Sequence, residues 1–148
     1  MKKTLILSFM AFWAFAGTVS AQDKTAEELV SSMTKADMTY RELMETMGKS
    51  SSTIHEGILR QNKQMVEVGA RFILTHPAPS HKPWTIMVKE DQADFKNSLL
   101  GFDGILDEHA KNIVEAAKQE DWLEASSSAN ELMDACISCH SMWKDKVQ

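Results

Sequence analysis

The sequence predicts an all-α protein, because it is rich in Ala, Leu, Met, Glu and Lys and has no alternating strand pattern. Glycine and proline interrupt it in few places, so that four helical stretches remain. Four helices joined by short turns favour an antiparallel up-down-up-down four-helix bundle. We therefore expect one domain with one core, built from residues 22–148.

Residues 1–21 have the pattern of a cleaved secretory signal peptide. Lys2 and Lys3 precede an apolar run, and Val19-Ser20-Ala21 supplies small residues before a predicted cut ahead of Gln22. A membrane anchor is the weaker interpretation, because the apolar run is short and no stop-transfer flank follows it. No cysteine lies near the cut, which excludes lipid attachment there. We expect a periplasmic protein without a membrane anchor.

The first helix is expected to run from about Thr25 into the fifties, with Asp23 or Thr25 as its N-cap. Its seven-residue stripe suits a helix in a bundle and comprises Val30, Met33, Asp37, Tyr40, Met44, Met47, Ser51, Ile54 and Ile58. The second helix is expected over residues 63–75, before Pro77. Its predicted buried residues are Met65, Val68, Phe72 and Ile73.

Three prolines define a stiff connection from His76 to about Val88. The third helix is expected over residues 91–119, along Phe95, Leu99, Phe102, Leu106, Ile113 and Ala117. Asp121 is a natural N-cap for the fourth helix, which is expected over residues 122–144. This last helix carries Leu123, Leu132, Met133, Cys136, Cys139 and Trp143.

The formal charge is −5, and loss of Lys2 and Lys3 with the signal peptide makes it −7. This balance argues against nucleic acid or an anionic membrane surface as a partner and mildly favours basic partners.

The two cysteines belong to the pattern Cys136-Ile137-Ser138-Cys139-His140, which is the attachment motif of c-type haem. Two thiols three residues apart lie on one helical face, so both can form thioethers with the two vinyl groups along one haem edge. The next residue, His140, then becomes the proximal ligand of the iron. We expect one covalent haem c.

Other interpretations of the cysteine pair are less well supported. A disulfide would close a loop too small to constrain much of the unfolded chain. A thioredoxin-like redox pair is expected in a βαβ context, early in a helix. A zinc site needs two further soft ligands, and the chain has no other cysteine.

A four-helix chain of this length with this motif in its last helix resembles the cytochrome c′ family and its low-spin, methionine-ligated relatives. The resemblance covers residues 22–148. After the motif the family usually has an aromatic residue and then Arg, where this chain has Trp143 and Lys144. In the first helix, the segment from Tyr40 to Gly48 is similar to the family's segment on the distal side of the haem. That segment supplies an apolar blocking residue in high-spin members and a Met ligand in low-spin ones.

The resemblance leaves more than one candidate for the sixth iron ligand. The Met-x-x-x-Gly spacing before Gly48 selects Met44, whereas alignment on Tyr40-Arg41 places Glu45 there. Met47 lies on the same stripe, and both methionines also suit a role in core packing. Two further possibilities stay open, which are an iron without a second protein ligand and ligation by one of His55, His76, His81 and His109.

Electron transfer through the haem in the periplasm is the leading functional hypothesis. The alternative is a five-coordinate haem that binds nitric oxide or carbon monoxide. We do not expect an enzyme, because no distal acid–base residue can be assigned. A redox protein with a basic surface is the expected partner, and the oligomeric state, including a homodimer, stays open.

Overall fold

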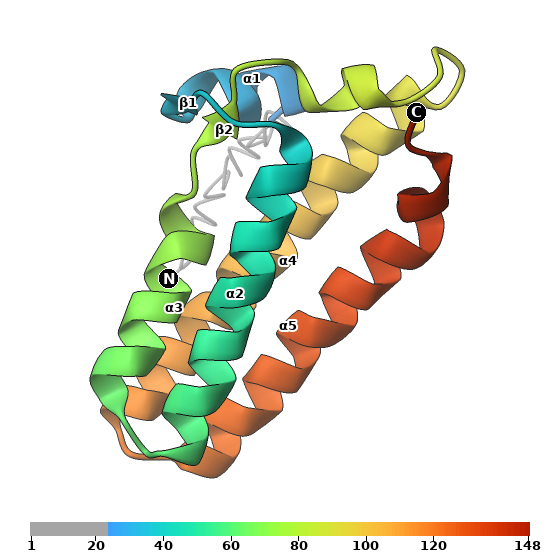
Figure 1. Ribbon diagram of the computed structural model, residues 1–148. Helices are drawn as coiled ribbons and strands as arrows, with labels where there is room; N and C mark the ends of the chain where they lie inside the picture. The colour runs from blue at the N-terminus through green and yellow to red at the C-terminus, as the bar shows by residue number, and fades with distance from the viewer. Residues whose placement is uncertain (1–23) are drawn as a thin grey trace, which may run out of the picture.

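The computed structural model describes residues 24–148, so the predicted signal peptide lies outside the described residues. Within this range the chain forms five α-helices, two short 3-10 helices and one pair of two-residue strands (Figure 1). The predicted all-α class is confirmed. No helix in residues 24–148 combines the length and the apolar composition needed to cross a membrane.

The single long first helix was a wrong prediction, because two helices occupy this stretch: α1 (Ala26–Ser32) and α2 (Tyr40–Leu59). Each begins with a capping box, in which a Thr hydroxyl accepts a backbone N–H and a Glu carboxylate accepts the N–H of that Thr. The carboxylate distances are 2.8 Å from Glu28 to Thr25 and 2.7 Å from Glu42 to Thr39. The second box starts a new helix at Thr39. Asp37, predicted on the inner stripe, is exposed in the break.

The break between α1 and α2 is tied to the proline-rich connection. Strand β1 (Lys35–Ala36) pairs in parallel with β2 (Ala78–Pro79), and the Ala78 N–H donates to the Thr34 carbonyl at 2.8 Å. The 3-10 helix η1 (Pro83–Ile86) follows β2. Figure 1 shows α1, the two strands and η1 lying across one end of the longer helices.

Four longer helices make up the body of the molecule: α2, α3 (Lys63–Thr75), α4 (Gln92–Lys118) and α5 (Trp122–Trp143). Helix α3 packs on α2 and α4, and α5 packs mainly on α4. The turns at Gln61 and Glu120 use left-handed backbone with φ of 51° and 61°. Asn62 and Asp121 then cap α3 and α5, which confirms the prediction for Asp121.

The buried face of α3 differs from the predicted one. Val66, Gly69, Ala70 and Ile73 are buried, whereas Val68 is 56 % exposed. A Cβ added to Gly69 would lie 2.7 Å from the carbonyl oxygen of Ser50, so α2 and α3 approach each other through this glycine. Because α2 and α3 lie so close together, small residues occupy the centre of the buried face of α3. In α5, the apolar side chain of Leu123 is 86 % exposed.

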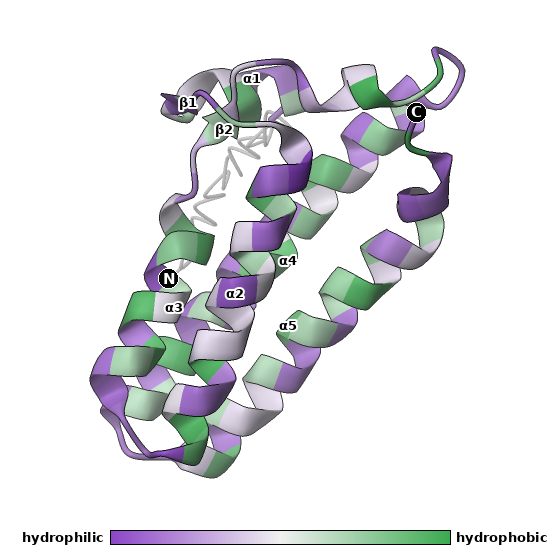
Figure 2. Cartoon of the chain, viewed as in Figure 1, coloured by the Kyte–Doolittle hydropathy of each residue, from purple (hydrophilic) through white to green (hydrophobic). Residues whose placement is uncertain are grey.

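Two separate apolar clusters form the core. The larger lies among α2, α3, α4 and α5 and includes Ile54, Val66, Ile113 and Leu132. The smaller joins α1, η1 and the adjoining ends of α4 and α5 and includes Trp84, Phe95 and Trp143. In Figure 2 the turns at the far end from α1 are hydrophilic, whereas α1 and η1 carry apolar residues at the other end. Helix α5 ends in the 3-10 helix η2 (Lys144–Lys146).

Candidate functional site

An apolar cavity of about 240 Å³ lies at the α1 end of the molecule, where α5 runs away from α2 in Figure 1. Its walls come from α1, α2, α4, α5 and the proline-rich connection. Most of the lining is aliphatic, aromatic or thioether in character: Ala26, Leu29, Val30, Met33, Leu43, Met44, Met47, Leu99, Phe102, Leu106, Met133 and Ile137. Such a site suits a largely apolar ligand.

Both cysteines line this cavity from α5. They are one helical turn apart on one face, half-buried, and not joined as a disulfide. Cys136 packs against the larger core cluster and Cys139 against the smaller one. The cysteine pair therefore bridges the two parts of the core at the cavity wall.

Burial raises the pKa of the Cys136 thiol above its ordinary value. Burial also raises the pKa of Cys139, with a further increase from the neighbouring Cys136. Cysteines that act as redox nucleophiles or bind metal do so as thiolates, and their pKa is usually lowered. This environment does not favour the thioredoxin-like interpretation of the motif.

His140 follows Cys139 on α5 and lines the same cavity. His140 is an exposed residue, so the cavity reaches the protein surface at this position. The three residues of the predicted attachment motif are thus brought together on one cavity wall. Within residues 24–148, no three His, Cys, Asp or Glu side chains are grouped so that they could bind a metal ion.

Met44 and Met47 both line the cavity from α2 and are half-buried. Met47 also packs against the larger core cluster. Met44 contributes to neither of the two clusters that the described residues form. Of the two, Met44 is therefore the methionine with less packing to lose on binding a ligand, although the cavity wall includes both. Glu45, the competing position in the alignment, is exposed and is not among the lining residues of the described chain.

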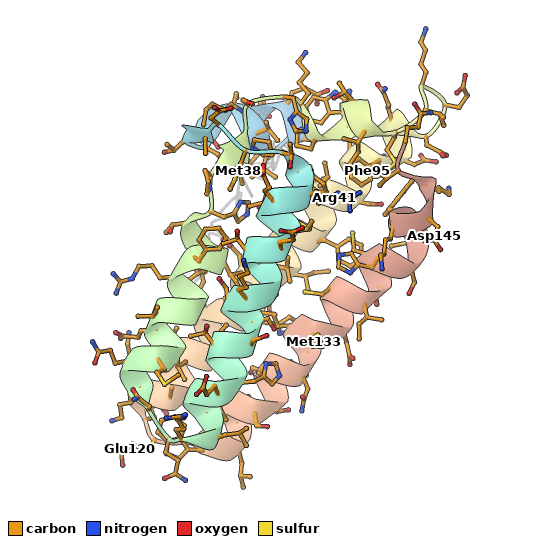
Figure 3. All side chains as sticks on the ribbon, viewed as in Figure 1. Met38, Arg41, Phe95, Glu120, Met133 and Asp145 are labelled. Atoms are coloured by element: carbon orange, nitrogen blue, oxygen red, sulfur yellow. The ribbon has the colours of Figure 1, made fainter. Side chains whose placement is uncertain are left out.

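Two further methionines belong to the cavity wall, and the sequence alone did not assign them to it. Met33 lies just after α1, and Met133 lies on α5, where Figure 3 labels it. Met33 belongs to the predicted stripe of the first helix. It lines the cavity in a chain whose helix is interrupted between α1 and α2.

Of the five histidines in the sequence, only His76 and His140 are on the described cavity wall. His55 Nδ1 lies 2.9 Å from the Ser51 carbonyl oxygen, and His109 Nδ1 lies 3.2 Å from a carboxylate oxygen of Glu131. His81 is half-buried in the connection and is not among the lining residues. His76, one of the histidines left open as a sixth ligand, is thus on the cavity wall, although its place just before Pro77 favoured a helix-capping role from the sequence alone. It does occupy the C-cap of α3.

The cavity wall contains the types of side chain that would hold a covalently bound haem. Two thiols, two imidazoles and four thioethers lie around an apolar space. Ser51 adds a hydroxyl that is 4 % exposed, lines the cavity and has no hydrogen-bond partner among the described residues. A buried hydroxyl usually has a partner, so this one fits a bound group that carries a polar atom.

Comparisons with protein-family models, with curated proteins and with solved structures gave no match to this chain.

Proposed function

We propose that this chain is an exported monohaem c-type cytochrome that carries electrons in the periplasm. On this proposal, residues 22–148 form the antiparallel up-down-up-down four-helix bundle of the cytochrome c′ family, with one haem c attached to α5. The observation that carries it is that Cys136, Cys139 and His140 line one apolar cavity together with the α2 methionines Met44 and Met47.

Each cavity residue has a defined role. The sulfur atoms of Cys136 and Cys139 form the two thioether bonds, and an imidazole nitrogen of His140 binds the iron. The apolar walls exclude water, which favours retention of a large flat ligand. When bound, the haem supplies an iron centre that gains and loses one electron.

The methionine thioethers that α2 contributes to the cavity wall favour electron transfer over gas binding. Met44 lies on the cavity but outside both core clusters of the described chain. Methionine together with histidine saturates the iron and raises its potential, as an electron carrier requires. Leu43 supports the gas-binding alternative, because this buried neighbour lines the same wall and would form an apolar barrier over an open sixth position.

Optical spectroscopy of the purified protein distinguishes the two functions. An electron carrier is expected to be low-spin in both oxidation states and to bind carbon monoxide slowly or not at all. A high-spin spectrum with rapid carbon monoxide binding would favour the gas-binding function instead. A protein without haem absorption would contradict both.

A further inference from the structure

His76 is held between two oxygen atoms. Its Nδ1 lies 3.2 Å from the Pro77 carbonyl oxygen, and its Nε2 lies 3.5 Å from Oδ1 of Asp103 on α4. A neutral imidazole has a hydrogen on only one ring nitrogen, whereas the imidazolium has one on each. The surroundings of His76 therefore match its protonated form.

The electrostatics around His76 agree with this geometry. Burial lowers the pKa of His76, but Asp103, the Pro77 carbonyl and the more distant Asp107 outweigh it, and the net pKa lies above the ordinary value. The side chain is 16 % exposed and that of Asp103 is 23 % exposed, so water screens their interaction only partly.

His76 and Asp103 form a wall shared by two spaces. One is the apolar cavity that contains the cysteine motif. The other is a more polar pocket of about 260 Å³ between α1, α3 and α4, to which Lys24, Ser32, Thr34 and Asp107 contribute. A proton can thus reach His76 from a polar space while the imidazole ring borders the apolar one.

We propose that proton binding by His76 is coupled to the electron in the haem cavity, so that its imidazolium form is favoured more strongly when the electron is present than when the electron has left. This inference rests on the proposed function. An added electron makes the cavity more negative by one charge, and the apolar lining screens that charge weakly. The imidazolium then becomes more favourable, so the proton is taken up through the polar pocket. The added proton then offsets part of the added negative charge.

The other titratable groups around His76 are less suited to this role. Asp103 and Asp107 face it from α4, and Lys24 faces it from the chain before α1. Across the cavity, burial raises the pKa of Tyr40, which stays neutral. Cys136, Cys139 and His140 are used in holding the haem. Histidine is the side chain whose ordinary pKa lies nearest neutral pH, which leaves His76 as the group suited to this role on the cavity wall of the described chain.

The test is the midpoint potential of the holoprotein measured against pH. The native potential is expected to fall as pH rises through the titration of His76. His76→Gln should lose this dependence, while His109→Gln, which changes a histidine outside the cavity wall, should keep it. In NMR titrations of the native protein, the His76 ring should release its proton at higher pH in the reduced than in the oxidised state.

Different results identify which claim fails. A haem protein whose potential does not change with pH, or whose pH dependence survives His76→Gln, overturns the proton-coupling inference alone. If His76→Gln does not fold, equal His76 pKa values in the two oxidation states of the native protein would overturn it. A purified native protein without covalent haem contradicts the proposed function, and the inference falls with it.

Discussion

The ring of Phe95 meets the indole of Trp143 edge-on, with ring centroids 5.3 Å apart and planes at 73°. The ring of Tyr40 also meets Phe95 edge-on, with ring centroids 6.1 Å apart and planes at 78°. These contacts join the first turns of α2 and α4 to the last turn of α5, beside Cys139. The aromatic group thereby fixes the end of the helix that carries the cysteine motif.

Replacing Phe95 with Ala should destabilise the protein by about 3–5 kcal/mol, because a ring that is 2 % exposed would leave a cavity. Urea unfolding followed by circular dichroism measures the change in the free energy of unfolding. Leu123→Ala is the control, since that side chain is 86 % exposed and its loss should cost within about 0.5 kcal/mol. Equal effects of the two substitutions would show that the aromatic group does not stabilise the fold.

Two glycines should respond to substitution in opposite directions. An Ala at position 69 would place its Cβ 2.7 Å from both the Ser50 carbonyl oxygen and Cγ1 of Ile54. Because the carbonyl belongs to the backbone of α2, the two helices must separate, at a cost of about 1–3 kcal/mol. Gly104 lies within α4, and a Cβ there meets no atom within 4 Å. Gly104→Ala should therefore stabilise by about 0.5–1 kcal/mol.

Thermal unfolding of the two variants beside the native protein tests this pair. A Gly69→Ala protein that melts at or above the native temperature would mean that α2 and α3 do not pack through this glycine.

The sixth ligand can be tested with two matched methionine variants. Met44→Ala should convert a low-spin spectrum to high-spin and admit carbon monoxide or nitric oxide. Met47→Ala should keep the spectrum and mainly lose packing, by less than the roughly 2–5 kcal/mol of a fully buried Met, since Met47 is half-buried. A low-spin spectrum that survives Met44→Ala and is lost on Met47→Ala or on a histidine substitution would move the ligand to that residue.

The protein without haem should be much less stable than the holoprotein. The cavity adjoins both core clusters through the two cysteines, so a bound apolar group would join them into one core. A ligand bound only by the folded state also stabilises it directly. The Cys136→Ala/Cys139→Ala variant should therefore melt well below the holoprotein in a circular dichroism scan. Cooperative melting of both proteins at the same temperature would contradict this.

Local signals predicted most of the helices. The second helix was predicted with the observed bounds, because Pro77 and the polar turn before Lys63 limit it on both sides. The break after α1 was missed, although Thr39-Tyr40-Arg41-Glu42 has the spacing of a capping box. The seven-residue stripe continues across the break, so this pattern did not indicate that the first helix ends there. The face of α3 was misassigned because the close approach at Gly69 depends on its partner helix, and hydrophobicity alone does not reveal it.

The candidate site was predictable where its residues are adjacent in sequence. Cys136, Cys139 and His140 lie within one turn and a half of a helix, so their pattern alone indicated their proximity. His76 is brought to the cavity by the end of α3, the pairing of β1 with β2 and the approach of Asp103 from α4. These contacts join segments far apart in the chain, and no local pattern contains them.

Intact mass spectrometry of the purified protein tests the central claim most directly. We predict the mass of residues 22–148 plus one haem, and loss of the added haem in the Cys136→Ala/Cys139→Ala variant. A native mass equal to that of the polypeptide alone, with Cys136 and Cys139 as free thiols or as a disulfide, would contradict the claim that this chain is a c-type cytochrome.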